Sequence, residues 1–467
     1  MRLSTLLYIP ASVYAHAFGQ RYDLPVPLAL YLWGAAAVVL LSFLVAVLFL
    51  GVPRSRERVL TIDIGDTWFG RVLTSAPVRM TLEGLSLALF LLVIATGAFG
   101  HVNTAKNFAP IFVWVIWWVG MAYVAAFLGN LWGLVNPWRI LYRRAQRFVD
   151  SLARPRFEYP QRLGAWPAVA LLFAFAYLEF ISGVAQRPRT LAVNVIAYTL
   201  ITFTGMRAFG REVWLRHGEV FSVLFGLMAR FGLFDGCRKP SRVLTLRLPG
   251  SGLLNSEPVT TSLMAFTLLM LTAVSFDGFL ETPLWASILR WATGFAATPA
   301  DVVKLVKTLA LVLFYGLFAG VYLVFSYLVA SLSGESEGTL MTARTYVLSL
   351  VPIAIAYHLA HYLSYLLVAG QLIIPIASDP FGYGWNLFGT AAYRLDIGVI
   401  GAKQVWYLAV SAIVVGHIAA VCVAHVTALR RIGDRHRAIV AQLPMLVLMV
   451  GYTMISLWIL SQPIVSH

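Results

Sequence analysis

Charged residues are scarce in this chain of 467 residues. Asp, Glu, Lys and Arg together make up 12% of it, whereas hydrophobic residues make up 60%. A soluble domain usually carries about 25% charged residues. Half of that charge cannot cover a water-facing surface of this size, so we expect lipid to solvate most of the surface. The composition therefore predicts an integral membrane protein in contact with the lipid bilayer.

Cysteine is also nearly absent, because the chain has only Cys237 and Cys422. Cys237 lies in a basic segment and Cys422 in a hydrophobic run, a placement that excludes a disulfide framework and a Cys-based zinc site. Walker A, Gly-x-Ser-x-Gly and dinucleotide-binding motifs are missing from the sequence. These absences argue against ATP-driven transport by this chain alone and against serine-hydrolase chemistry.

The net charge of +15 is the one feature that suggests nucleic acid. Lys and Arg, however, lie in the segments between hydrophobic runs rather than along one face of a soluble domain. Positive charge confined to loops is typical of membrane proteins, in which it sets the orientation. We therefore expect no nucleic-acid partner.

Ten hydrophobic runs are long enough to cross about 30 Å of hydrocarbon, so we expect an all-α bundle of about ten spanning helices. The expected spans are 26–51, 81–99, 109–132, 165–184, 190–206, 259–276, 305–331, 345–375, 404–428 and 439–461. Residues 219–234 are amphipathic and too short to cross, so they are expected at the interface or as a short helix packed over the bundle.

The chain begins with a short signal-like segment. Residues 1–15 combine one Arg, an apolar stretch and a small-residue end, which predicts a signal peptide cleaved after Ala15. An uncleaved interfacial segment is the alternative. No internal repeat or soluble domain follows, so residues 16–467 are expected to form a single transmembrane domain.

The loops between the expected spans differ in positive charge. Loops 52–80, 133–164, 207–258 and 429–438 are rich in Arg, and 332–344 is the exception on that side. The alternate loops carry few basic residues. This asymmetry places the Arg-rich loops in the cytoplasm of a bacterial inner-membrane protein. Both the mature N-terminus and the C-terminus are then expected on the outer face.

Four ionisable residues fall inside the expected spans, where they are costly and count as functional candidates. Glu179, His358 and His361 lie roughly 18–23 Å along outward-running helices from the cytoplasmic end, and His417 lies about 20 Å in from the outer end of the next span. These levels overlap near the middle of the membrane.

The histidine spacing suggests a metal site. His358 and His361 are three residues apart, so both project from one helix face. With His417 from the adjacent antiparallel span they could ligate a divalent metal, zinc or a similar ion, while Glu179 completes the shell or acts as a base. Two alternatives stay open: interhelical hydrogen bonding with no further role, and haem ligation by two histidines on facing helices.

A second group of polar residues is expected on the outer face. Segment 375–390 contains Asp379 in a turn rich in Gly and aromatic residues. Asp379 could close a pocket over the membrane site and is the second candidate base. An interfacial aromatic anchor is the alternative. Asp277 and Glu281 are the other acidic candidates on this face.

Four strings resemble one known family over most of the chain. They are AHAFGQRYDLPVPLALYLWGAA, FAPIFVWVIWWVGMAYVAAFLGNLWGLVNPWR, HGEVFSVLFGLMARF and YHLAHYLSYLLVAGQLIIPIASDPFGYGWNLFGTA. Together they resemble a family of bacterial multi-pass membrane proteins known as fenitrothion hydrolases. The resemblance implies hydrolysis of an organophosphorus triester to a phenol and a dialkyl thiophosphate, and it assigns no catalytic residues. His101 departs from the family pattern.

The candidate residues are compatible with that chemistry. Triester hydrolysis needs a hydroxide and a Lewis acid, which a histidine cluster with a carboxylate could supply. A small apolar substrate would partition into lipid and enter sideways. Two other functions fit the same residues: a transporter or metal-handling protein whose pathway they line, and a non-catalytic membrane subunit that scaffolds a partner.

Overall fold

The computed structural model describes residues 26–462, except for 51–60, 184–186, 237–243, 255–256, 295–298 and 335–337. The expected signal peptide, residues 1–15, lies outside the described residues. The expected all-α bundle is confirmed, because ten helices among the described residues are long and apolar enough to cross a membrane. Their bounds are Leu28–Phe49, Ala76–Phe99, Phe108–Phe127, Gln161–Phe180, Pro188–Phe209, Thr261–Leu280, Ala300–Ser333, Thr339–Ser378, Ala402–Arg431 and Arg435–Ser461.

Seven of these spans are single helices: α2 (Leu28–Phe49), α4 (Ala76–Phe99), α10 (Pro188–Phe209), α13 (Thr261–Leu280), α15 (Ala300–Ser333), α19 (Ala402–Arg431) and α20 (Arg435–Ser461). The other three are composite. They contain α5 (Phe108–Ile111), π-helix η2 (Phe112–Val119) and α6 (Gly120–Phe127); η4 (Gln161–Leu163) and α9 (Trp166–Phe180); and α16 (Thr339–Tyr346), η6 (Val347–Leu350), α17 (Val351–Ala369), η7 (Gly370–Leu372) and α18 (Ile373–Ser378).

Shorter elements connect the spans. The helices are α3 (Trp68–Leu73), η1 (Thr104–Lys106), α7 (Trp132–Val135), α8 (Pro137–Ala145), η3 (Asp150–Leu152), α11 (Arg211–His217), α12 (Val220–Met228), η5 (Ser251–Leu253) and α14 (Pro283–Thr293). Strands β1 (Thr61–Asp63), β2 (Phe234–Gly236) and β3 (Leu244–Arg247) form an antiparallel sheet in the order β1-β3-β2. The register pairs Ile62 and Phe234 with Leu246.

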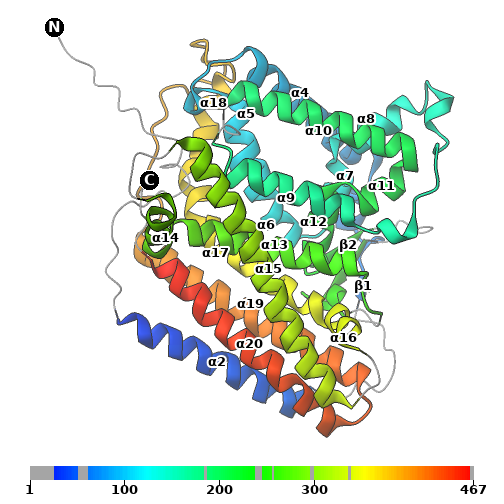
Figure 1. The fold of residues 1–467 in the computed structure, drawn as a ribbon. Helices are drawn as coiled ribbons and strands as arrows, with labels where there is room; N and C mark the ends of the chain where they lie inside the picture. Colours follow the sequence, from blue (N-terminus) through cyan, green and yellow to red (C-terminus); the bar gives the residue numbers. More distant parts are fainter. Residues whose placement is uncertain are drawn as a thin grey trace.

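The spans pack in two groups around a central pair of helices (Figure 1). Helices α2, α15, α19 and α20 contact one another on one side, and α4, α5, α9 and α10 lie on the other. Between them, α13 packs against both α9 and α17. Nearly all of α13 is buried, whereas Leu313 and Leu317 of α15 are 70% and 67% exposed. An apolar exposed surface is stable only in lipid, which fits a multi-pass membrane protein.

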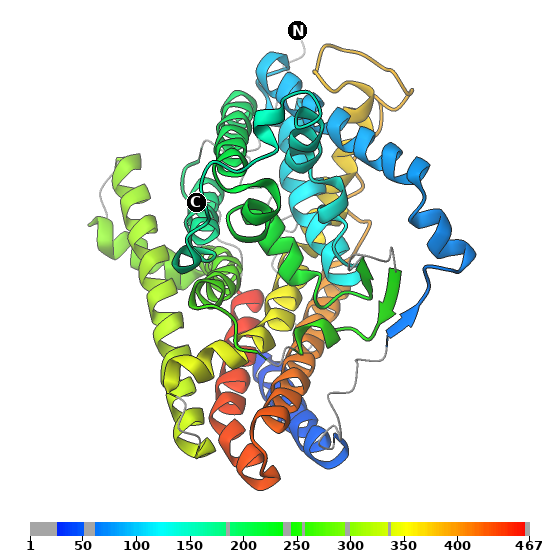
Figure 2. The same cartoon turned by 90° about the vertical axis from the view of Figure 1, so that its right-hand side faces the viewer.

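The two ends of the bundle carry different elements. We call the end with α14 and residues 379–401 the loop end, and the end with the sheet and α16 the sheet end (Figure 1). Figure 2 has the side with the sheet turned toward the viewer. At the sheet end the Arg247 guanidinium donates to the carbonyls of Gly232 and Ala229 and pairs with Asp235 at 3.1 Å, which fixes the loop after α12.

Helix α12 corrects the expectation for residues 219–234. Its residues Val220, Phe221, Val223, Leu224, Phe225, Leu227 and Met228 are all buried. The helix therefore lies inside the bundle rather than at the interface or over the bundle. Trp117 and Trp132 pack against Phe221 and Phe225 from neighbouring elements, so aromatic side chains rather than lipid surround its apolar faces.

Candidate functional site

The centre of the candidate site is a carboxylate on α13 that is shared by two side chains of α17. Asp277 lies on α13, and its Oδ2 is 2.9 Å from Nε2 of His361 on α17. The hydroxyl of Tyr362 donates to the same oxygen at 2.7 Å. His361 is 8% exposed. A carboxylate bonded to one ring nitrogen fixes the orientation and tautomer of an imidazole, as in catalytic His-Asp pairs.

A glycine permits this close contact between α13 and α17. A Cβ atom placed on Gly278 would lie 2.8 Å from the hydroxyl oxygen of Tyr357 and 2.9 Å from a methyl group of Ile459. Any larger residue would therefore force the side chains of Tyr357 and Ile459 to shift. Tyr357 also stacks on His361, with ring centroids 6.2 Å apart, so the imidazole is held from two sides.

His358 and Glu179 form the deeper part of the site. The ring of His358 lies 4.7 Å from that of Tyr362 and 5.8 Å from that of Trp118. Its Nε2 is buried and has no hydrogen-bond partner among the described residues. Glu179 of α9, His358 and Tyr362 all line a cavity of about 20 Å³. Most of its lining is apolar, but the cavity is large enough for one water molecule, and Glu179, His358 and Tyr362 supply polar partners for it.

Toward the loop end the site continues to Glu281, which follows the last turn of α13 and is half-buried. Burial, reinforced by the nearby Asp277 carboxylate, raises the pKa of Glu281 to about 7, although His361 and Lys307 of α15 oppose the shift. The polar groups from Glu281 through Asp277 and His361 to Glu179 thus run from the rim of the bundle into its interior.

His417 does not join this group, which corrects the expected three-histidine metal site. Its Nδ1 lies 2.8 Å from the Ile413 carbonyl, and its ring faces Tyr452 at 6.0 Å. No group of three or more His, Cys, Asp or Glu side chains is arranged to hold a metal ion in the described part of the chain. His358 and His361 belong instead to the set around Asp277 and Glu179, so this set of donors does not fit a zinc ion bound by three histidines.

Asp379 lies in a structural turn rather than over the site. Its two carboxylate oxygens accept from the amides of Tyr383 and Gly384 at 2.9 and 2.7 Å. The turn is fixed to the loop end of α4, because the Tyr383 hydroxyl donates to the Phe99 carbonyl. Because the chain from His361 to Ser378 is helical and rises about 1.5 Å per residue, Asp379 lies roughly 27 Å further along the helical path than His361. The candidate base role of Asp379 is therefore not supported by its position.

A much larger apolar cavity adjoins the site. It has a volume of about 420 Å³, within the range of small-molecule pockets. Its walls come mainly from α4, η2, α9 and α10, and its polar side chains are Ser86, Asn194 and Tyr198. Phe175 lines this cavity and also the water-sized one, so a single aromatic layer separates the apolar cavity from Glu179 and His358.

A buried acid that was not identified from the sequence lies directly before Val220 and Phe221, two residues of the cavity lining. Glu219 is 0% exposed, and its carboxylate accepts from Tyr198 at 2.5 Å and from Asn136 at 3.0 Å. It also caps α12 by accepting from the amides of Phe221 and Ser222. The available signal was an acid directly before the apolar run 220–228, the position of a helix N-cap.

Comparison with protein-family models, curated proteins and solved structures gives no match for this chain. The resemblance to fenitrothion hydrolases therefore stays a prediction.

Proposed function

We propose that the chain is an integral membrane hydrolase that acts on apolar triesters of the organophosphorus type, taken up from the bilayer. One observation carries the proposal: a cavity of about 20 Å³ lined by Glu179, His358 and Tyr362 lies one aromatic layer away from an apolar cavity of about 420 Å³. The small cavity suits the attacking water, and the large one suits the substrate.

In the proposed reaction Glu179 and His358 orient one water molecule and Glu179 accepts its proton. The water oxygen then forms a bond to phosphorus, and the bond from phosphorus to the phenol oxygen breaks. The phenolate takes the proton that Glu179 accepted, which Tyr362 and the His361–Asp277 pair relay to it, so Glu179 returns to its ionised form. General acid–base catalysis of this kind typically contributes about 10²–10⁴-fold in rate. Phe175 or Trp118 must rotate for the substrate to reach the water.

The test is release of the phenol from fenitrothion by the purified full chain in lipid nanodiscs. We expect Glu179→Gln to lower kcat by about 100-fold or more, since the substitution removes the proton acceptor but keeps the shape. Asp379→Asn is the matched control and should keep wild-type turnover. Correct folding is checked by circular dichroism and size-exclusion chromatography. Wild-type-like turnover by folded Glu179→Gln, or no turnover by the wild type, would refute the proposal.

A second candidate, proton-coupled transport, is favoured by a line of polar groups that leaves the site toward the sheet end. Ser275 on α13 contacts the hydroxyl of Tyr452, whose ring faces His417. Two turns further along α19, Nδ1 of His425 lies 3.0 Å from Oε1 of Gln442. Proton uptake into proteoliposomes that is lost in His417→Phe, with hydrolysis absent from the wild type, would favour transport.

We also propose that the sheet end faces the cytoplasm of a bacterial inner membrane. The proposal is supported by the Arg-rich segments, which include 133–164 and 429–438, and by the rule that such loops stay inside. A reporter fused after the last residue tests it. Alkaline phosphatase should be active there and a fluorescent protein dark, and the reverse pattern would overturn the orientation.

A further inference from the structure

The apolar cavity ends in a group of arginines at the sheet end. Its lining reaches Leu82 on α4 and Trp138 on α8, and the next residues along the chain are Glu83 and Arg139. Nε of Arg79 and Nη2 of Arg143 lie 3.8 and 2.5 Å from the two oxygens of Glu83. Glu83 is 4% exposed. Two guanidinium groups therefore share one buried carboxylate at this end of the cavity.

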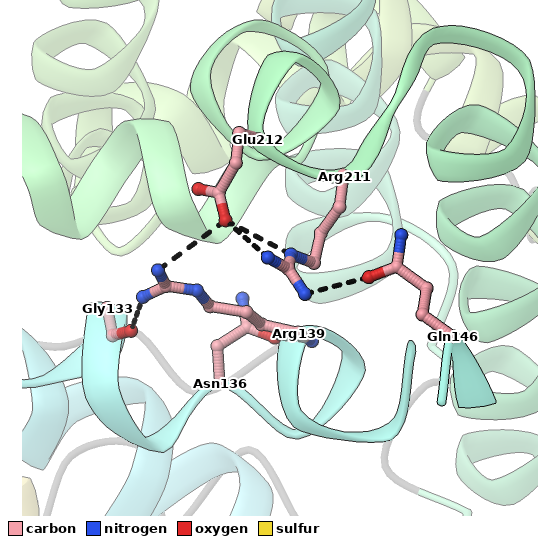
Figure 3. A network of polar contacts seen from close by, with 6 residues as sticks. All are labelled: Gly133, Asn136, Arg139, Gln146, Arg211 and Glu212. Atoms are coloured by element: carbon pink, nitrogen blue, oxygen red, sulfur yellow. Dashed lines mark hydrogen bonds and ion pairs between the residues drawn. The ribbon is translucent and has the colours of Figure 1, made fainter. Parts of the chain in front are cut away.

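A neighbouring network adds two more arginines (Figure 3). Glu212 lies 3.7 Å from Nη2 of Arg139 and 2.9 Å from Nη2 of Arg211. Arg211 also donates to the side-chain oxygen of Gln146 at 2.9 Å, and Arg139 donates to the Gly133 carbonyl. Four arginines thus meet two carboxylates, Glu83 and Glu212, and four minus two leaves a formal excess of two positive charges.

These arginines are accessible from outside the protein, and the cavity itself is open to lipid. The side chains of Arg79, Arg139 and Arg143 are 43%, 37% and 34% exposed. Leu85 of α4 and Ile201 of α10 line the cavity and are themselves 55% and 45% exposed. The cavity therefore reaches the lipid-facing surface between α4 and α10.

Helices α4 and α10 are in tight contact at the loop end. The opening of the cavity between them is therefore confined to the turns further from that end. A Cβ atom on Gly97 would lie 2.8 Å from both the Ala192 Cβ and the Pro188 carbonyl oxygen, so α4 and α10 touch there. A chain-like ligand can consequently enter from the side, at the turns nearer the arginines, with its polar group left at the sheet end.

We propose that this cavity binds one acyl chain of an anionic phospholipid of the surrounding membrane, whose phosphate is held by Arg79, Arg139 and Arg143. The almost wholly apolar lining accepts an acyl chain and excludes a headgroup, because a polar group buried there would lack partners. The excess positive charge selects an anionic over a zwitterionic headgroup, and Arg suits phosphate oxygens. The binding does not depend on the proposed hydrolysis, and an acyl chain and an apolar triester would occupy this cavity in turn.

The tryptophans of the cavity wall provide a direct readout. Trp114, Trp117, Trp132 and Trp138 all line it. Phosphatidylglycerol with brominated acyl chains should quench their fluorescence in the detergent-purified full chain at lower lipid concentration than brominated phosphatidylcholine. Free glycerol phosphate, which carries the headgroup chemistry without a chain, should not compete at equal concentration.

Two variants with a matched control test the two halves of the site. Arg139→Gln/Arg143→Gln should weaken phosphatidylglycerol binding by roughly 10- to 30-fold, since each interfacial Arg contributes about fivefold. Arg144→Gln/Arg147→Gln removes the same charge from exposed residues in and just after α8 and should change binding by less than about threefold. Ala174→Phe, which adds a ring inside the cavity, should abolish quenching by the bound chain.

The proposal has three outcomes that would overturn it. Equal binding of the two lipids would show that charge plays no part. An equal loss in the control variant would show a diffuse surface effect. Wild-type quenching in Ala174→Phe would show that the chain lies outside the cavity. The binding is measured again in Glu179→Gln, in which we expect it unchanged, so a failure of the proposed hydrolysis leaves this result standing.

Discussion

Removal of the Glu219 carboxylate should destabilise the whole protein. Glu219→Ala removes the N-cap of α12, which costs about 1 kcal/mol. It also leaves the half-buried Tyr198 hydroxyl without its acceptor and removes one of the two acceptors of the Asn136 amide, at about 1–3 kcal/mol for each group affected. The free energy of unfolding should therefore fall by about 3–7 kcal/mol. Glu219→Gln should have an intermediate effect, because it restores one acceptor oxygen but directs an NH₂ group at two donors.

The measurement is denaturant titration in mixed micelles, followed by circular dichroism. Glu212 supplies the control, because it is an acid only seven residues away whose side chain is 59% exposed. Glu212→Ala should change the free energy of unfolding by no more than about 0.5–1 kcal/mol, as is usual for exposed ion pairs. Equal losses in Glu219→Ala and Glu212→Ala would refute the argument, since burial and partner number would then not determine the cost.

Three further outcomes are expected. The infrared band of the protonated Glu281 carboxyl group, identified by its absence from Glu281→Gln, should disappear as the pH rises. Its midpoint should lie at about 7, because burial favours the neutral form of Glu281. A midpoint near 4.5 would contradict that burial. Gly416→Ala should lower the free energy of unfolding by about 1–3 kcal/mol, since its Cβ would lie 2.3 Å from that of Ala356. Gly451→Ala, which has open space around its Cβ, should leave the free energy of unfolding unchanged. Equal shifts of the thermal unfolding midpoint in the two variants would contradict this packing. Asp379→Ala should speed cleavage of the 379–390 turn by chymotrypsin and leave turnover unchanged, and a loss of turnover would restore Asp379 as a candidate base.

The length of the hydrophobic runs was sufficient to predict the spanning helices, but it predicted the ends of those helices less well. The span expected at 345–375 begins at Thr339 and ends at Ser378, since α16 and α18 extend the helical path beyond its most apolar part. The short α12 was misplaced because its buried position depends on aromatic partners from η2 and α7, which local hydropathy does not reveal.

The candidate site was predicted in part. Helical spacing and depth in the membrane identified His358, His361 and Glu179 as candidates, because both quantities can be read from the sequence of a single helix. Depth gives the level of a residue but not the direction in which it faces, and for this reason His417 was wrongly grouped with them. The pairing of Asp277 with His361 needs the contact between α13 and α17, which are not consecutive spans.

The π-helix η2 makes the aromatic layer sensitive to chain length. Over Phe112–Val119 the backbone turns hold more residues than an α-helix does, so Trp117 lines the large cavity while Trp118 lines the small one. Loss of one residue here would allow ordinary α-helical turns, in which neighbouring residues lie about 100° apart, and would change which side chains between α5 and α6 face the two cavities. A change that relaxes the backbone would therefore misalign both indoles, so this segment should tolerate substitution far better than deletion.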